Sequence, residues 1–271
     1  MTGRGLTARL VLLTAVPGLP GMAAASDRVE VYILAGQSNM SGRGDPAALS
    51  DTERVADPRL RLYGNDGQWR PALDPLDDPA GQVDAVSADR QASVGPGLFF
   101  ARALLRARDA DIALVPCGKG GSSIARWQPG RDRTTLYGSC VARVVEAGGH
   151  PSGLLWYQGE SDAEKSISAA PSWASSFRRM ADGFRRDLKA PRLPIVMVQL
   201  ADRPDVNTAR FPGWAAIQEQ QAQPFGRCTA MVSAKGLARN ADGLHLATDA
   251  QRVLGPRLAE AMVGLRQKGC K

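Results

Sequence analysis

Histidine is scarce in this chain of 271 residues, which contains only His150 and His245. A zinc site built from several histidines is therefore excluded unless carboxylates or thiolates supply most of its ligands. A reaction that needs an imidazole base must use one of these two residues. His150 lies in a Gly-Gly-His-Pro turn with no acidic residue nearby, so we expect it to be an ordinary loop residue.

Long apolar runs and long runs of one charge are also missing. The apolar stretch Leu10–Val16 falls short of the roughly 20 residues that cross a bilayer, and no later stretch is longer. The net charge is +7, yet the arginines are scattered and form no basic stripe that could follow a phosphate backbone. We therefore expect neither membrane insertion nor a nucleic-acid partner.

The N-terminus has the pattern of a secretory signal peptide. Arg4 and Arg9 precede the apolar stretch, and Pro and Gly then lead to three alanines that end at Ala25. Basic, apolar and small-residue regions in this order are what a signal peptidase requires. The alternative is a short core helix, but Pro and Gly would interrupt it. We expect cleavage near Ala25 and a secreted or periplasmic protein.

Cysteine is rare, and no two cysteines have C-x-x-C spacing, which gives no support to a zinc or thioredoxin-like site. In an exported protein, four cysteines predict two disulfides, and three pairings are possible. The sequence leaves the choice between these pairings open. The four residues are Cys117, Cys140, Cys228 and Cys270.

Apolar runs alternate with helical patterns along the rest of the chain. Near-continuous apolar runs predict strands covered on both faces, at Val29–Ala35, Ile112–Pro116, Gly153–Tyr157, Pro194–Leu200 and Thr229–Ser233. Helices are expected between and after them, at Gly97–Arg108, Arg133–Ala147, Ser172–Leu188, Gly213–Gln223 and Thr248–Gln267. This alternation predicts an α/β fold, with a parallel sheet of about five strands between two helical layers.

One segment departs from the alternation. Asp51–Ala92 is rich in Asp, Pro and Gly, and we expect a long surface excursion with at most one short edge strand, Leu60–Tyr63. No repeat and no linker divides the chain. We therefore expect residues 26–271 to form a single domain after a signal peptide at residues 1–25.

Ser38 directly follows the first expected strand. A serine at the carboxyl end of a parallel strand faces the crevice where open α/β sheets bind ligands. The surrounding Gly36-Gln37-Ser38-Asn39-Met40 lacks the second glycine of the G-x-S-x-G elbow of α/β-hydrolases. Ser38 is thus a candidate nucleophile, and the alternative is a simple helix cap.

Asp242-Gly243-Leu244-His245, late in the chain, could supply the base. A hydroxyl is a poor nucleophile until a base takes its proton, and the imidazole must be oriented by a third group. An Asp three residues before a His, across a glycine turn, lets one loop present both. The alternative is a surface Asp beside a packed His.

Two further segments follow strands at the same expected edge. The glycine turn at Gly120 and Gly121 and the amide side chain of Gln158 offer N–H groups that could stabilise a developing oxyanion. The spacing around Gly120 is not that of a phosphate-binding Walker loop. Glu160 and Asp162 could imitate the paired carboxylates of a glycosidase, but we expect Glu160 to be a structural hydrogen-bonding partner.

Together these segments resemble the SGNH-hydrolase superfamily. The resemblance is closest to its sialate O-acetylesterase-like branch, which includes the acetyl xylan esterases of carbohydrate esterase family six. The segments that carry it are Gly36–Gly44, Val94–Leu98, Val115–Cys117, Gly120–Ser122, Trp156–Asp162 and Asp242–His245.

The resemblance implies a flavodoxin-like α/β/α sandwich that requires no metal or other cofactor. It implies Ser38 as nucleophile, His245 as base and Asp242 as the residue that orients it. The oxyanion hole would consist of the Ser38 amide, a glycine amide and the Gln158 side chain. Gly120 is the better match for that glycine, with Gly121 close behind. Asn39 and Glu160 would support these groups.

The expected function is therefore the removal of O-acetyl groups from a carbohydrate such as xylan, sialic acid or a related glycan. One alternative keeps the triad but uses a lipid ester or thioester, which would need a long apolar channel. Another alternative is a non-catalytic carbohydrate-binding protein, against which an intact Ser38, Asp242 and His245 argue.

Overall fold

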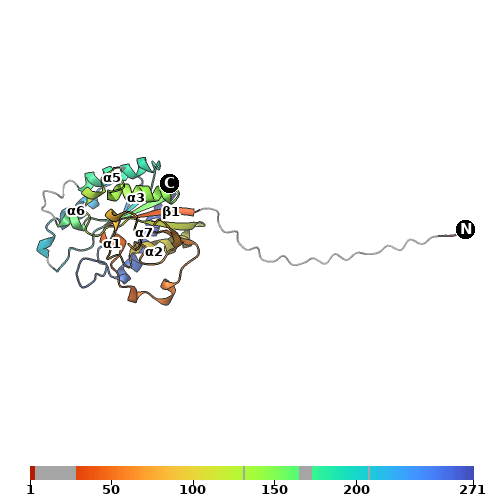
Figure 1. Ribbon diagram of the computed structural model, residues 1–271, viewed down its shortest axis with the longest axis horizontal. Coiled ribbons are helices and arrows are strands. Elements are labelled where there is room, and N and C mark those ends of the chain that lie inside the picture. Colours follow the sequence, from red (N-terminus) through yellow and green to blue (C-terminus); the bar gives the residue numbers. More distant parts are fainter. Residues whose placement is uncertain (4–28, 131, 165–172, 207) are drawn as a thin grey trace.

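The computed structural model describes residues 1–3, 29–130, 132–164, 173–206 and 208–271 (Figure 1). The expected signal peptide therefore lies outside the described residues, apart from its first three. Among the described helices, none combines the length and the apolar character needed to cross a membrane.

A seven-stranded sheet in the order β3-β2-β4-β1-β5-β6-β7 forms the centre of the protein. All neighbouring strands are parallel except β2 and β3. The strands are β1 (Val29–Gly36), β2 (Leu60–Tyr63), β3 (Trp69–Pro71), β4 (Asp111–Pro116), β5 (Pro151–Tyr157), β6 (Ile195–Gln199) and β7 (Thr229–Ser233).

The expected count of about five strands was too low. All five expected strands are present, but β2 is paired on both sides, and β3 forms the edge instead. The three residues Trp69–Pro71 are too few to show any alternation of apolar and polar side chains, and they lie among turn residues. Their pairing with β2 is a tertiary effect that local pattern does not reveal.

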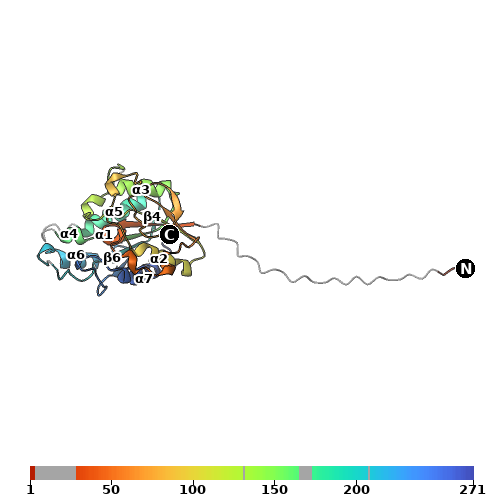
Figure 2. The same cartoon turned by 60° about the horizontal axis from the view of Figure 1, so that its bottom comes forward.

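Helices cover both faces of the sheet. Figures 1 and 2 show α3 and α5 over one face and α2 and α7 over the other. The α-helices are α1 (Ser38–Ser41), α2 (Pro96–Ala107), α3 (Leu136–Glu146), α4 (Glu160–Ala163), α5 (Trp173–Asp187), α6 (Trp214–Gln221) and α7 (Thr248–Gln267). The 3₁₀ turns are Pro46–Ala48, Asp51–Arg54, Ala85–Ser87, Ile124–Trp127 and Thr208–Arg210. The expected α/β architecture with a covered, mostly parallel sheet is confirmed.

The burial of both faces of the central strand β1 explains why a continuous apolar run predicted this strand. Successive side chains of a strand point to opposite faces, and both Tyr32 and Ile33 are completely buried. Each face of β1 therefore packs under a helical layer. On one of these layers Gly255 lets α7 approach α2 closely, since a methyl group there would lie 2.4 Å from Cβ of Phe99.

Residues 51–92 are more than the surface excursion expected from their composition. Leu60 and Ala72 are completely buried, and the carboxyl-bearing residues Asp77 and Asp89 are 3% and 4% exposed. The segment is held by scattered polar contacts, which leave no periodic pattern in the sequence. Part of it reaches the carboxyl edge of the sheet.

Two disulfides select one of the three possible pairings. Cys117, directly after β4, is bonded to Cys140 in α3, and Cys228, before β7, is bonded to Cys270 near the C-terminus. The first disulfide fastens the end of a central strand to a covering helix. The second ties down the chain end.

Candidate active site

Ser38 is placed by the sharp exit of the chain from β1. A methyl group at Gly36 would lie 2.1 Å from the Tyr157 carbonyl oxygen, so only glycine allows β1 and β5 to approach this closely. The next amide, of Gln37, donates to the same Tyr157 carbonyl at 2.8 Å. Ser38 then begins α1, and an amide at the first position of a helix has no acceptor within that helix.

The loop before α7 brings an imidazole to this serine. His245 Nε2 lies 2.9 Å from Ser38 Oγ, and His245 Nδ1 lies 2.6 Å from Asp242 Oδ2. Asp242 also accepts the backbone amides of Leu244 and His245 at 2.9 and 3.0 Å through its other oxygen. The structure thus brings together all three residues of the expected triad, although 207 positions separate Ser38 and His245 in the sequence.

In its ionised form, the Asp242 carboxylate is suited to orient the imidazole ring of His245. Partial burial tends to raise its pKa, but hydrogen bonds from the His245 amide, the His245 ring and the Leu244 amide lower the pKa below its usual value. Gly243 makes the turn possible, with a φ of +67°. A charged carboxylate beside Nδ1 favours the tautomer that leaves Nε2 free to accept the serine proton.

Asn39, next to Ser38, connects the nucleophile segment to the loop that carries His245. Its Nδ2 donates to Glu160 Oε1 at 2.6 Å and to the Leu244 carbonyl at 3.4 Å, while its Oδ1 accepts the Leu246 amide at 2.9 Å. His245 is therefore held on both sides by contacts to the residue next to Ser38. Asn39 and Glu160, the two residues expected to support the site, are thus hydrogen-bonded to each other.

Glu160 is a buried carboxyl. It is 1% exposed, and its Oε2 has no hydrogen-bond partner within the described part of the chain. Burial raises the pKa of Glu160 to about 7, although the hydrogen bond from Asn39 opposes the shift. Burial also raises the pKa of Asp74 to about 7 and that of Asp77 to about 6.

These shifts predict that the protein loses stability as the pH rises from 5 to 8. A carboxyl whose pKa is higher in the folded than in the unfolded state keeps its proton in the fold, so its stabilising contribution is complete below the unfolded pKa. That contribution disappears as pH passes the folded pKa. For Glu160, the expected loss in the free energy of unfolding is about 3 kcal/mol.

Urea unfolding of Glu160→Gln across this pH range measures the contribution. We expect the variant to lose clearly less stability than the wild type between pH 5 and 8, because its side chain does not titrate. The exposed Glu219→Gln variant is the control and should keep the wild-type slope. Identical slopes in Glu160→Gln and wild type would contradict the assignment.

The glycine turn after β4 differs in one respect from expectation. The Gly120 amide donates to Asp89 Oδ2 at 2.8 Å, so it is already used within the protein. Gly121, with a φ of +70°, lines the cavity beside Ser38, and a methyl group there would meet no atom within 4 Å. Both glycines line the cavity, but the Gly120 amide is already bound to Asp89.

Gln158, expected in the oxyanion hole, is not among the residues that line the cavity beside Ser38. Its side chain is completely buried, and Nε2 donates to the Ser122 carbonyl at 3.0 Å and to the Asp162 carboxylate. Its Oε1 accepts the indole N–H of Trp173 at 2.9 Å. The amide is therefore committed to packing the loops after β4 and β5 together. A Gln directly after a strand gives no sign in the sequence of which way its side chain turns.

The remaining polar candidates are also accounted for. Asp162 is 7% exposed and accepts the Ile124 amide at 2.8 Å besides the Gln158 side chain, so it supports the loops rather than forming a carboxylate pair with Glu160. His150 is exposed and directly precedes β5, so it lies at the amino-terminal ends of the parallel strands, whereas Ser38 lies at their carboxyl ends. It has no place in this site.

A cavity of about 540 Å³ opens over Ser38 and His245. Its wall contains the charged residues Arg43, Asp89, Arg90, Lys119, Glu160, Glu164 and Arg210, and its few apolar lining residues are Ala85, Ala88 and Leu244. A cavity with this lining suits a polar molecule that offers many hydrogen-bonding groups. Asp89 is one residue of this wall that the sequence did not point to, because its contacts join distant segments.

Known proteins resemble this chain in both sequence and fold. Residues 28–264 match the family described as carbohydrate esterase, sialic acid-specific acetylesterase. The chain is 35% identical over 253 residues to the probable carbohydrate esterase At4g34215 of Arabidopsis thaliana, covering 86% of this chain and 89% of the relative.

Solved structures agree. The structure of the Arabidopsis thaliana protein AT4G34215 has a TM-score of 0.73 at 33% identity, over 87% of this chain and 98% of that one. The carbohydrate acetylesterase XAC1771 from Xanthomonas citri has a TM-score of 0.62 at 25% identity, over 87% of this chain and 56% of that one. The match to the family over most of its length shows that this chain belongs to the sialic acid-specific acetylesterase family of carbohydrate esterases and is a carbohydrate O-acetylesterase.

Proposed function

We propose that Ser38, His245 and Asp242 remove an O-acetyl group from a sugar by way of an acetyl-enzyme. The observation that carries the proposal is the continuous hydrogen-bonded chain from Asp242 through His245 to Ser38, at 2.6 and 2.9 Å, in which Ser38 and His245 line the cavity. Such a chain lets the imidazole take the serine proton as the hydroxyl attacks.

The reaction then proceeds in two halves. Ser38 Oγ bonds to the acetyl carbon while its proton moves to His245 Nε2. The bond between the acetyl carbon and the sugar oxygen breaks, and His245 returns the proton to that oxygen. A water molecule, deprotonated by His245, next attacks the acetyl-enzyme and releases acetate and the free Ser38 hydroxyl.

The oxyanion that forms in each half needs donors placed before the reaction begins. The amides of Ser38 and Gly121 are our candidates, since the first starts a helix and the second borders the cavity. Amides of the backbone suit this task because they need no reorganisation when negative charge develops.

We propose an acetylated xylan, sialic acid or related glycan as the substrate, rather than a lipid ester or thioester. A lipid chain would need an extended apolar channel, whereas charged side chains dominate this cavity. The family name and the carbohydrate acetylesterase from Xanthomonas citri support a sugar substrate.

Acyl chain length tests this choice. We expect kcat/KM for p-nitrophenyl acetate to exceed that for the octanoate ester by at least about tenfold, because the cavity has few apolar side chains to receive extra methylenes. Acetate release from acetylated xylan and from O-acetylated sialic acid should accompany this preference. A preference for octanoate with no acetate release from any acetylated glycan would support a lipid substrate instead.

We also propose that the enzyme works outside the cytoplasm, secreted or periplasmic. The basic, apolar and small-residue pattern that ends at Ala25 supports export. The disulfides Cys117–Cys140 and Cys228–Cys270 support it independently, because such bonds persist in oxidising compartments.

A further inference from the structure

The carboxylate of Asp89 joins the two loops that border the catalytic serine. Its Oδ2 accepts the Ser41 hydroxyl at 2.7 Å and the Gly120 amide at 2.8 Å. The Arg43 guanidinium binds both of its oxygens, at 2.9 and 3.0 Å. Ser41 and Arg43 follow Ser38 closely in the chain, whereas Gly120 belongs to the glycine turn after β4. A single buried side chain therefore connects the nucleophile segment with the glycine turn.

We propose that Asp89 is a positioning residue that holds the glycine turn against the nucleophile segment, so that the Gly121 and Ser38 amides can receive the same oxyanion. This inference rests on the proposed acetyl-transfer mechanism. Because Asp89 occupies the Gly120 amide, the turn is fixed at Gly120, and the following amide is the one left for substrate.

The close fit at Gly120 supports this arrangement. A methyl group at Gly120 would lie 2.5 Å from Arg43 Nη2 and 3.0 Å from Asp89 Oδ2. The Arg43–Asp89 pair thus lies directly against the backbone of the turn, and a side chain at Gly120 would displace the Arg43 guanidinium. Neighbouring Lys119 adds a second tie, since its Nζ donates to the Ala88 carbonyl at 2.6 Å.

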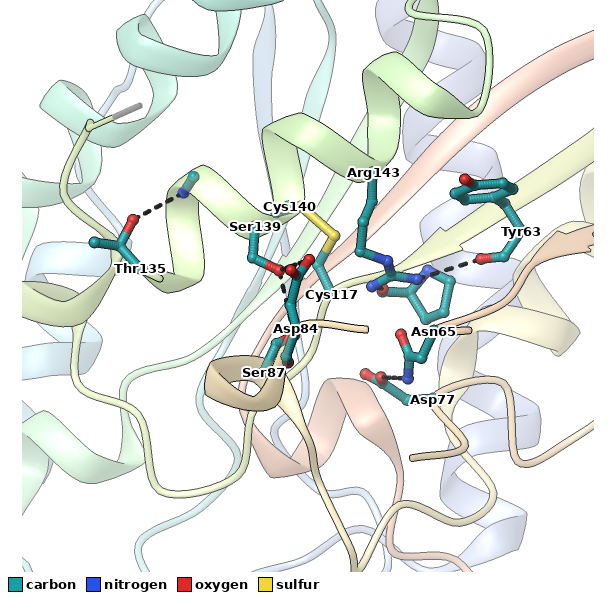
Figure 3. The surroundings of a disulfide bond; sticks show 12 residues. Tyr63, Asn65, Asp77, Asp84, Ser87, Cys117, Thr135, Ser139, Cys140 and Arg143 are labelled. Atoms are coloured by element: carbon teal, nitrogen blue, oxygen red, sulfur yellow. Dashed lines mark hydrogen bonds between the residues drawn. A yellow bond between two sulfur atoms is a disulfide. The ribbon is translucent and has the colours of Figure 1, made fainter. Parts of the chain in front are cut away.

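The segment that carries Asp89 is itself braced against α3. Asp84 accepts the Ser139 hydroxyl at 2.8 Å, and Arg143 donates to the Tyr63 carbonyl at 3.3 Å (Figure 3). Figure 3 also shows the Cys117–Cys140 disulfide beside these contacts, where it fastens the end of β4 to the same helix. The glycine turn and the segment that presents Asp89 therefore share one rigid support.

The charge of Asp89 matters as much as its position. Burial tends to raise the pKa of Asp89, but hydrogen bonds from Ser41 and Arg43 and the positive charge of Arg43 lower the pKa below its usual value. The Ser41 hydroxyl, the Arg43 guanidinium and the Gly120 and Gln91 amides all donate to the carboxylate, so an ionised acceptor satisfies each of these donors. An asparagine of the same shape would point an N–H₂ group at one of these donors.

Steady-state kinetics with Asp89→Asn test the proposal. We expect kcat for acetyl esters to fall by about 10²–10³-fold, the effect of losing one oxyanion donor, while KM changes less than about threefold. The affinity for a boronic acid that forms a tetrahedral adduct with the serine should fall by a similar factor. The matched control is Asp66→Asn, since Asp66 lies in the same segment but pairs with Arg70 away from the cavity.

A folded Asp89→Asn enzyme whose kcat stays within threefold of wild type would overturn the proposal. If Asp89→Asn does not fold, Ser41→Ala decides, because it removes one donor to Asp89 and keeps the others. We then expect kcat to fall about threefold to tenfold at unchanged KM, and an unchanged kcat would overturn the proposal. Full activity in Ser38→Ala would instead refute the acetyl-transfer mechanism itself, so the two failures can be told apart.

Discussion

Replacing Ser38 with alanine is expected to lower kcat/KM for acetyl esters by about 10⁴-fold or more. The reason is that Ser38 Oγ is the atom held at 2.9 Å from His245 Nε2, at the floor of the cavity. Without this oxygen no acetyl-enzyme can form, and the remaining amides could only assist direct attack by water. The measurement is the initial rate of p-nitrophenyl acetate hydrolysis, with thermal unfolding to confirm that the variant folds.

Ser152→Ala is the matched control for this substitution. Ser152 lies near the amino-terminal end of β5, whereas Ser38 follows the carboxyl end of the neighbouring parallel strand β1. This variant should keep wild-type activity. A folded Ser38→Ala protein with wild-type turnover would remove the assigned nucleophile.

His245→Ala is expected to cause a loss of similar size in kcat/KM, about 10⁴-fold or more. In the proposed mechanism the imidazole both accepts the serine proton and returns it to the sugar oxygen, so its removal stops both halves of the reaction. Asp242 cannot replace it, because Asp242 contacts the ring at Nδ1 and the Leu244 and His245 amides. The same ester assay measures the effect.

The chain provides its own control, because His150 is the second of only two histidines. His150 is exposed, directly precedes β5 and is not among the residues that line the cavity. We expect His150→Ala to match wild type in kcat/KM. Loss of activity in His150→Ala together with retention in His245→Ala would reverse the assignment of the base.

The sequence predicted the features that depend on local pattern. Strands covered on both faces leave continuous apolar runs, and this signal located β1, β4, β5, β6 and β7. The Asp242–His245 loop was readable because both residues lie in one turn. The position of Ser38 at the carboxyl end of β1 followed from the strand pattern, whereas its pairing with His245 was implied by the family resemblance.

The features that sequence reasoning missed depend on contacts between distant segments. Asp89 lies 31 residues from Gly120, in a segment whose composition indicates only turns. The direction of the Gln158 side chain is set by Trp173 and Asp162, which no spacing rule connects to it. The edge strand β3 exists because β2 offers it a partner, and not because of its own three residues.

Covalent labelling with a fluorophosphonate, followed by peptide mass spectrometry, tests the central claim most directly. A serine activated by an imidazole and faced by oxyanion donors attacks the phosphorus and stays modified. We predict one label, on Ser38, that is absent from His245→Ala. A protein that hydrolyses acetyl esters but is labelled at another residue, or is labelled equally well without His245, would contradict the account.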